Sequence, residues 1–214
     1  MASLEQSAIE IANRLGNEPV LVMFSGGKDS IVAADLMVKH YRGPMIFVYL
    51  YFVDGLKIKE SVLSWYQARF KAEIHHEPSP ETASLATGKR VKMADIEAGL
   101  RRKYDTSYLV QGVRKCESMA RRGMLKHLEF GIDHKYKKLY PVGDWSDREI
   151  WSYIKLHKLK VPIEYSFGMK HDIWVPDGAM MLFFKHNFQD DYRKIIAAYP
   201  QLETMTKREE MFPE

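Results

Sequence analysis

Short, unbroken apolar runs alternate with helical patterns through the first part of this 214-residue chain. The runs VLVMF (20–24) and MIFVYLYF (45–52) lack the polar alternation of a half-exposed strand, so both of their faces must be covered. Apolar residues at helical spacing follow each run, over 30–41 and 59–70. Strands that are separated by helices pair in parallel. The pattern therefore predicts an α/β fold with helices on both faces of the sheet.

Further segments complete the predicted fold. We expect three more strands, which give a five-stranded, mostly parallel sheet, at 73–77, 107–113 and 138–142. We expect additional helices at 3–15, 93–104 and 146–158, and one or two more within 177–200. A loop is predicted at 78–88, and the basic run 126–138 is expected to be a solvated connection. The domain prediction is a nucleotide-binding domain over 1–170 and a helical extension over 171–214 that packs on it.

The composition of the chain indicates in which cellular compartment the protein is expected and which kinds of partner it can bind. A single cysteine allows no internal disulfide and favours a reducing compartment. The N-terminus lacks the pattern of a signal peptide, and no apolar run approaches the length of a membrane span. We therefore expect a cytoplasmic protein with no membrane partner. A net charge of +4 suits an anionic small molecule, and nucleic acid is possible but not indicated by so mild a charge.

The segment SGGKDS (25–30) lies between the first strand and its helix. In α/β sheets, ligands bind at the carboxyl ends of the strands, and a helix N-terminus attracts anions. Glycines let the backbone approach a ligand, while lysine and serine side chains can bind phosphate oxygens. The segment predicts a phosphate-binding loop, formed by Ser25, Gly26, Gly27, Lys28, Asp29 and Ser30. A tight glycine-rich turn without a ligand is the alternative.

This loop fits neither of the two common nucleotide-binding patterns. Position 22 is valine and Lys28 is followed by Asp29, so the Walker pattern fails, and the dinucleotide pattern fails as well. The segment instead resembles the PP-loop of the ATP pyrophosphatase and adenine nucleotide alpha hydrolase superfamily, in which S-G-G-x-D-S follows the first strand.

Two further motifs narrow the resemblance. The segment GVRKCESMAR (112–121) matches G-x-R-x-x-E-S-x-x-R, and DWSDREIWSYI (144–154) matches a D-W-[ST] helix. Together with SGGKDS, over about residues 18–170, these motifs resemble the phosphoadenosine phosphosulfate (PAPS) reductase family. That family also includes the small subunit of sulfate adenylyltransferase and DNA-sulfuration proteins. A surface salt-bridge cluster is the alternative for 112–121.

The resemblance implies an enzyme that binds ATP, or a nucleotide similar to PAPS or adenosine phosphosulfate (APS). We expect transfer of the adenylyl group to an anionic or nucleophilic co-substrate, by reaction at the α-phosphate with release of pyrophosphate. The loop would hold the β- and γ-phosphates, and Lys28, Arg114 and Arg121 would be catalytic through their charge. The further residues expected at the nucleotide are Met23, Phe24, Val53, Asp54, Gly112, Glu117 and Ser118.

Metal and histidine predictions are less specific. Asp54 is expected to meet the ribose or a Mg²⁺ ion, with the capping of a turn before Gly55 as an equal alternative. Mg²⁺ is expected with the nucleotide. The histidine pair His75 and His76 lacks the spacing of a zinc site, so no zinc is expected. His171 falls where the substrate-side loop of the family would lie.

The chain departs from the reductases of this family in its cysteines. Those enzymes carry a nucleophilic cysteine near the C-terminus, whereas the only thiol here is Cys116, for which a buried or half-buried structural role is expected. One cysteine also cannot supply a four-cysteine iron–sulfur cluster, so no cluster is expected. A sulfonucleotide reductase that uses Cys116 stays open, as does a non-catalytic nucleotide-binding subunit that needs a partner. A homodimer or a partner subunit is possible.

Overall fold

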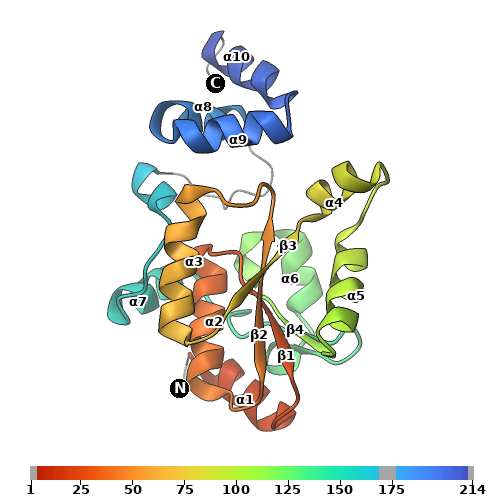
Figure 1. The fold of residues 1–214 in the computed structure, drawn as a ribbon. Coiled ribbons are helices and arrows are strands. Elements are labelled where there is room, and N and C mark those ends of the chain that lie inside the picture. The colour runs from red at the N-terminus through yellow and green to blue at the C-terminus, as the bar shows by residue number, and fades with distance from the viewer. Residues whose placement is uncertain (1–3, 169–176, 212–214) are drawn as a thin grey trace.

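The computed structural model describes residues 4–168 and 177–211. Six strands form one sheet in the order β3-β2-β1-β4-β6-β5 (Figure 1). Their bounds are β1 Val20–Met23, β2 Met45–Tyr51, β3 Ile74–Pro78, β4 Tyr108–Val110, β5 Ile132–Asp133 and β6 Lys138–Leu139. The predicted α/β fold is confirmed, but the sheet has six strands in the described residues rather than five.

The sheet is parallel except at one edge. Strand β1 lies at the centre and pairs in parallel with β2 and β4, so that Val22 lies beside Phe47 and Val110. The extra strand, β5, pairs antiparallel with β6. It falls within 126–138, where the predicted solvated connection holds for the exposed residues 134–137 but is wrong for the buried residues 131–133. Ile132 is buried in the core, and this apolar contact draws the basic segment back onto the sheet.

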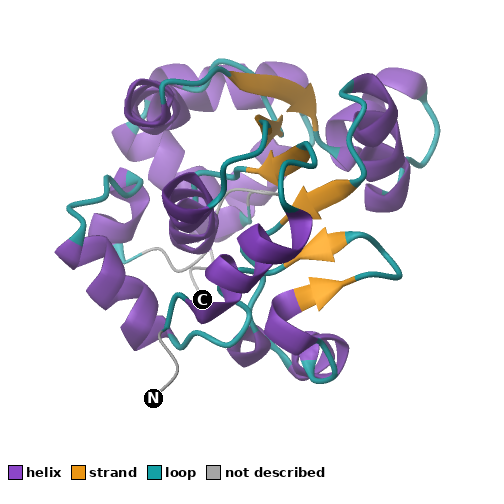
Figure 2. Ribbon diagram, turned by 90° about the horizontal axis from the view of Figure 1, so that it is seen from below, coloured by secondary structure: helices purple, strands orange, loops and turns teal. Residues whose placement is uncertain are grey.

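Helices cover both faces of the sheet (Figure 2). Their bounds are α1 Gln6–Leu15, α2 Lys28–His40, α3 Lys57–Phe70, α4 Pro80–Thr87, α5 Met93–Lys103, α6 Met119–Leu125, α7 Asp147–Leu156, α8 Gly178–Asn187, α9 Gln189–Ala198 and α10 Leu202–Met211. Three 3-10 helices complete the description: η1 Lys115–Glu117, η2 Glu129–Gly131 and η3 Ile163–Phe167. Among the described residues, no helix combines the length and apolar character needed to cross a membrane.

Helix α4 lies where the sequence predicted a loop. Its signals are local, because the Ser79 hydroxyl accepts a hydrogen bond from the Thr82 N–H and Pro80 occupies the first turn. Both features favour a helix start, so the proline and serine content that suggested a loop in fact marks an N-cap.

The two faces of the sheet have different cores. On one face, α1, α2, α3 and α7 bury the larger core, which includes Val22, Phe24 and Phe47. On the other face, α5 covers a smaller core around Leu21, Val48 and Leu109. Side chains of a strand alternate between faces, so β1 contributes to both cores.

The C-terminal helices α8, α9 and α10 lie beyond the carboxyl end of β2 (Figure 1). They share a third apolar cluster with Phe52, Leu56 and Ile58, which follow that strand. The carboxylate of Asp191 accepts hydrogen bonds from the N–H groups of Lys57 (2.9 Å) and Ile58 (3.0 Å), at the start of α3. The division of the chain into two domains remains a prediction, and its boundary at 170 lies outside the described residues.

Candidate nucleotide-binding site

The loop after β1 turns at Gly26, whose φ of +77° favours glycine because it has no Cβ. Hydroxyl groups hold the loop closed: Ser25 Oγ and Ser30 Oγ lie 3.0 Å apart, and Ser30 Oγ donates to the Gly27 carbonyl at 2.9 Å. Helix α2 begins at Lys28, and its N-cap is Gly27, which has no side chain. The loop therefore presents a helix N-terminus that has no capping side chain of its own, which is a favourable place for an anion.

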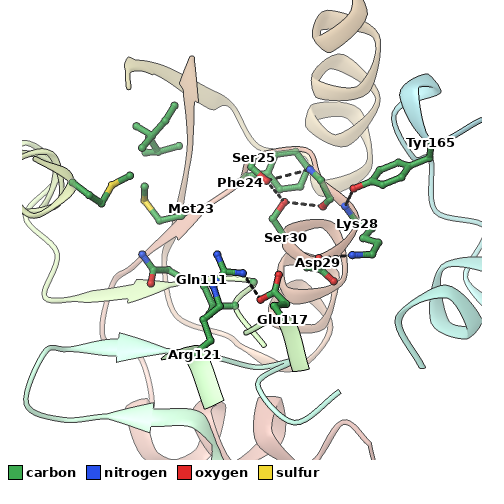
Figure 3. A pocket seen from close by; sticks show the side chains of 16 residues that line it. Met23, Phe24, Ser25, Lys28, Asp29, Ser30, Gln111, Glu117, Arg121 and Tyr165 are labelled. Carbon is green, nitrogen blue, oxygen red and sulfur yellow. Dashed lines mark hydrogen bonds and ion pairs between the residues drawn. The ribbon is translucent and has the colours of Figure 1, made fainter. Parts of the chain in front are cut away.

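A cavity of about 360 Å³ lies beside this helix N-terminus (Figure 3). It occupies the carboxyl edge of β1 and β4. Ten of the residues predicted for the nucleotide site line it: Met23, Phe24, Ser25, Gly27, Lys28, Asp29, Ser30, Gly112, Glu117 and Arg121. The structure thus brings the loop and the motif after β4 together around one volume.

One side of the cavity is apolar. Met23 of β1 and Val48 and Leu50 of β2 line it, and Met93 at the start of α5 completes this wall. Met23 and Val48 are neighbours in the strand register. The wall continues the smaller core to the edge of the sheet, where it opens toward the phosphate loop. A ligand with an apolar ring and an anionic tail matches these two sides.

Lys28 and Asp29 form an ion pair at the mouth of the loop. Lys28 Nζ lies 2.8 Å from Asp29 Oδ2 and 3.4 Å from Asp147 Oδ1. Burial disfavours the charged ammonium, but the hydrogen bond and the charge of Asp29 outweigh it and raise the pKa of Lys28. For Asp29, burial is the stronger effect: it raises the pKa of this carboxyl group, although the charges of Lys28 and Arg114 act to lower it. Lys28 therefore remains a cation at neutral pH.

Arg114 lies behind the loop rather than among the described residues that line the cavity. It is only 1% exposed. Its Nε lies 2.7 Å from Asp29 Oδ1, an ion pair in which neither atom is aligned for a hydrogen bond. Its Nη2 donates to Asp147 Oδ1 at 2.8 Å, and its Nη1 donates to the Trp145 carbonyl at 3.3 Å. The guanidinium thus joins the phosphate loop to the start of α7.

Gly112 allows β4 to approach the phosphate loop closely. A Cβ at this position would lie 2.5 Å from the Ser30 nitrogen and 2.6 Å from the Asp29 carbonyl carbon. Both atoms belong to the backbone of α2, which cannot move aside as a flexible side chain can. The first residue of the second motif is therefore a glycine because two backbone segments meet there.

The remaining residues of the second motif have different surroundings. Arg121 is 45% exposed, lines the cavity and pairs with Glu117 at 2.6 Å. Glu117 also accepts a hydrogen bond from the Arg114 N–H at 2.7 Å. Ser118 is the N-cap of α6, where its hydroxyl accepts from the Arg121 N–H. Arg121 is thus the arginine of this motif that faces the cavity.

Val53 and Asp54 lie away from the set of described residues that line the cavity. Asp54 Oδ1 accepts hydrogen bonds from the Gly55 N–H at 3.0 Å and pairs with His76 Nδ1 at 2.8 Å. The first contact corresponds to the turn-capping alternative. A role of either residue toward the nucleotide remains a prediction without a contact to support it, and His171 lies outside the described residues.

Several lining residues were not predicted from the sequence. They are Val48, Leu50, Met93, Gln111, Val113 and Tyr165. The Tyr165 hydroxyl accepts a hydrogen bond from the Lys28 N–H at 3.2 Å, and Gln111 Nε2 donates to Glu97 at 3.0 Å. A signal existed for Val48 and Leu50, because alternate residues of a strand beside the loop share one face. Met93 and Tyr165 arrive from distant segments, and only the fold places them.

Cys116 is exposed, so the expectation of a buried or half-buried thiol was wrong. Its sulfur lies 3.0 Å from Arg114 Nη1 and 3.4 Å from the Trp145 carbonyl oxygen. The cysteine belongs to the short helix η1, none of whose residues is buried, whereas Arg114, just before that helix, is buried. Cys116 is not among the described residues that line the cavity, although Glu117, which follows it, is.

Solved structures share this fold. The PAPS reductase of Candida auris, in a phosphate complex, is 14% identical and superposes with a TM-score of 0.55, covering 78% of this chain and 86% of that one. The FMN adenylyltransferase of Candida glabrata, in complex with FMN and an ATP analogue, is 19% identical with a TM-score of 0.53, covering 78% and 62%. At such identities the likeness concerns the fold.

Sequence comparison gives the family. Sulfate adenylyltransferase subunit 2 of Mycolicibacterium vanbaalenii is 25% identical to this chain over 222 residues, covering 87% of this chain and 71% of that protein. The family model described as phosphoadenosine phosphosulfate reductase domain matches residues 19–169, which include the phosphate loop and the motif after β4. The resemblance inferred from the motifs is thereby confirmed, and the protein belongs to the phosphoadenosine phosphosulfate reductase domain family.

Proposed function

We propose that this protein binds ATP in the cavity and transfers its adenylyl group to an anionic or nucleophilic acceptor, with release of pyrophosphate. The observation that carries the proposal is the two-sided cavity, in which an apolar wall faces a helix N-terminus that carries Lys28. An adenine ring fits the first side and a triphosphate fits the second. The relationship to sulfate adenylyltransferase subunit 2 supports this reaction class.

The residues act by position and charge. The adenine lies against Met23, Val48 and Leu50, and the β- and γ-phosphates lie over the N-terminus of α2. Lys28 and the N–H groups of the helix neutralise the pyrophosphate as it leaves, because they are fixed before the reaction begins. Arg121 lines the cavity from the motif after β4, where it stabilises the α-phosphate or an anionic acceptor. Attack of the acceptor on the α-phosphorus then requires no covalent intermediate with the protein.

Mg²⁺ would accompany ATP, but the described cavity offers it no preformed carboxylate site. Asp29 is already held by Lys28 and Arg114, and Glu117 is held by Arg121 and the Arg114 N–H. Both carboxylates that line the cavity are thus engaged with cationic or N–H partners. We therefore assign Mg²⁺ no step of the reaction.

The two other functions are less well supported. A reductase would need a thiol at the nucleotide, and the only cysteine, Cys116, is not among the described residues that line the cavity. A nucleotide-binding subunit that needs a partner shares the same cavity. The relative is a subunit 2, which is compatible with such a partner, and the partner would complete the acceptor side near Arg121.

The test measures ATP binding by calorimetry and pyrophosphate release in the presence of Mg²⁺, with sulfate as the first acceptor. Lys28→Ala should weaken ATP binding at least about tenfold, since a hydrogen bond to a charged group contributes roughly 1.5–3 kcal/mol. Lys39→Ala is the matched control, because Lys39 lies at the other end of α2 and pairs with Glu5. Equal affinity of Lys28→Ala and the wild type would remove the proposed phosphate site.

A further inference from the structure

We propose that Asp54, Glu60 and His76 form a binding site for a divalent first-row transition-metal ion, separate from the nucleotide cavity. Each of the three side chains offers one ligand atom, and these atoms all lie within 4.8 Å of one another. A single ion can therefore contact all three after small side-chain movements.

Three elements of the sheet domain bring these ligands together. Asp54 lies in the turn after β2, Glu60 lies in the first turn of α3, and His76 lies in β3. Strands β2 and β3 pair in parallel, with Tyr49 beside His76 in the register. Because both strands end at the same edge of the sheet, the turn after β2 lies next to the histidine. Two of the three ligands thus stand on regular secondary structure, which limits their movement.

Two carboxylates lie close together at this place. Asp54 has one pairing with His76, at 2.8 Å. Within the described residues, the Glu60 carboxylate makes no hydrogen bond or ion pair, although it lies within 4.8 Å of that of Asp54. Two lysines close to this turn in the sequence or the fold have other partners: Lys57 pairs with Asp190 at 2.6 Å, and Lys194 donates to the Gly55 carbonyl. A bound cation would relieve the repulsion between the two carboxylates.

The donor set selects the class of metal. Two carboxylates and one imidazole suit Mn²⁺, Fe²⁺, Co²⁺ or Zn²⁺, whereas Mg²⁺ and Ca²⁺ prefer oxygen ligands alone. The Asp54 side chain is 56% exposed and that of His76 is 27% exposed, so water can complete the coordination. The spacing of histidines in the sequence did not predict a zinc site, because two of the three ligands are carboxylates that only the fold brings to His76.

The site is independent of the proposed nucleotide chemistry. Its three residues are absent from the described residues that line the cavity, although β2 contributes Val48 and Leu50 to that lining. Metal binding can therefore be measured on the full chain without nucleotide, and its failure would leave the adenylyl-transfer proposal untouched.

The experiment titrates EDTA-treated, dialysed protein with Mn²⁺ and with Zn²⁺ in a calorimeter at pH 7.5, with Mg²⁺ for comparison. We expect one ion per chain, a raised melting temperature in its presence, and weaker binding of Mg²⁺ than of Mn²⁺. His76→Ala and Glu60→Gln should each weaken Mn²⁺ binding by about tenfold or more. Lowering the pH to 5.5 should also weaken it, since the imidazole must be neutral to bind a metal.

His75→Ala is the matched control. His75 is the preceding residue of β3, and it lies against Tyr104 and Glu73 rather than in the cluster. Its loss should leave the affinity for Mn²⁺ unchanged. The far-ultraviolet circular dichroism of every variant is compared with that of the wild type, and Asp54→Asn replaces any variant that does not fold. Binding of Mn²⁺ that is equal in wild type, His76→Ala and Glu60→Gln, or no binding at 1 mM Mn²⁺, would overturn the proposal.

Discussion

The loop after β1 and the segment after β4 both carry a nucleotide-binding motif, but they present it differently. In the loop, five of six consecutive residues line the cavity, because a strand ends and a helix begins within that short stretch. In the segment, Gly112 packs on α2, Arg114 turns inward, and Arg121 faces the cavity. Neighbouring residues of a motif therefore line the same cavity only where the local backbone orients them toward it. The two arginines of the second motif allow this difference to be tested.

The largest expected effect is the loss of stability in Arg114→Ala. Among the described residues, removing this 1%-exposed guanidinium leaves Lys28 as the one cationic partner of Asp29, whose side chain is 16% exposed. Breaking a buried ion pair costs about 3–5 kcal/mol. The measurement is the free energy of unfolding in urea. Arg121→Ala is the control and should change it by less than about 0.5 kcal/mol, since Arg121 is 45% exposed. Equal losses in the two variants would contradict the division between an interior arginine and a cavity arginine.

Gly112→Ala should come next, with a loss of about 1–3 kcal/mol in the free energy of unfolding. The added methyl group meets backbone atoms of α2 at 2.5–2.7 Å. Gly123→Ala in α6 is the matched control, because a Cβ there meets nothing within 4 Å, and helical propensity favours alanine. If Gly112→Ala unfolds at the same urea concentration as the wild type, the close approach of β4 to the loop is not what requires glycine.

Arg121→Ala should weaken ATP binding by about tenfold while leaving the affinity for adenosine unchanged. A charge-assisted contact with a phosphate accounts for this difference, since adenosine lacks the phosphate. Calorimetry with both ligands measures it. A parallel loss for ATP and adenosine would show that Arg121 shapes the cavity instead of binding an anion.

The smallest expected effect concerns Asp147, the partner of Arg114 at the start of α7. Burial opposes the ionised form, but the hydrogen bond from Arg114 outweighs it and lowers the pKa of Asp147 below its ordinary 3.8. A lowered pKa stabilises the fold above the ordinary value, and this contribution disappears as the pH falls through the folded-state pKa. The Asp147 side chain is 68% exposed, so the contribution should stay below about 1 kcal/mol.

Asp147→Asn should therefore unfold more easily than the wild type at pH 7, and the difference should shrink below pH 3.8. Urea unfolding of both proteins at pH 7 and near pH 2.5 measures this trend. A difference that persists unchanged at the lower pH would assign the role of Asp147 to packing rather than to charge.

Local signals in the sequence were sufficient for the centre of the fold. The continuous apolar runs predicted β1 and β2, and the phosphate loop followed from glycines, Lys28 and the helix that begins there. The edge strand β5 was not predicted, because it consists of only Ile132–Asp133 and is too short to show a periodic pattern. Helix α4 was missed because Ser79 and Pro80 were taken as loop residues rather than as a helix start.

The residues of the candidate site also fall into two groups, those that local sequence signals predicted and those that only the fold places. Residues within the loop were predicted because the motif is contiguous, whereas Met93 and Tyr165 reach the cavity from segments far along the chain. The orientation of Arg114 also could not be predicted, because the two carboxylates that draw it inward come from different motifs. Contacts of that kind depend on how α2 and α7 pack against each other. The spacing of apolar residues in the sequence does not predict that packing.

The carboxylate of Asp191 has a consequence for how the protein folds and opens. Helix α3 begins after Leu56, which has no polar side chain to cap it, and its first N–H groups are satisfied from α9, 133–134 residues further along the chain. Closing so long a loop costs chain entropy, which the burial of Phe52 and Leu56 under the C-terminal helices offsets. The first turn of α3 and the docking of α9 therefore belong to one cooperative unit. Amide hydrogens of Lys57 and Ile58 should exchange with solvent only when the C-terminal helices detach, so two amides report the opening of an entire end of the molecule.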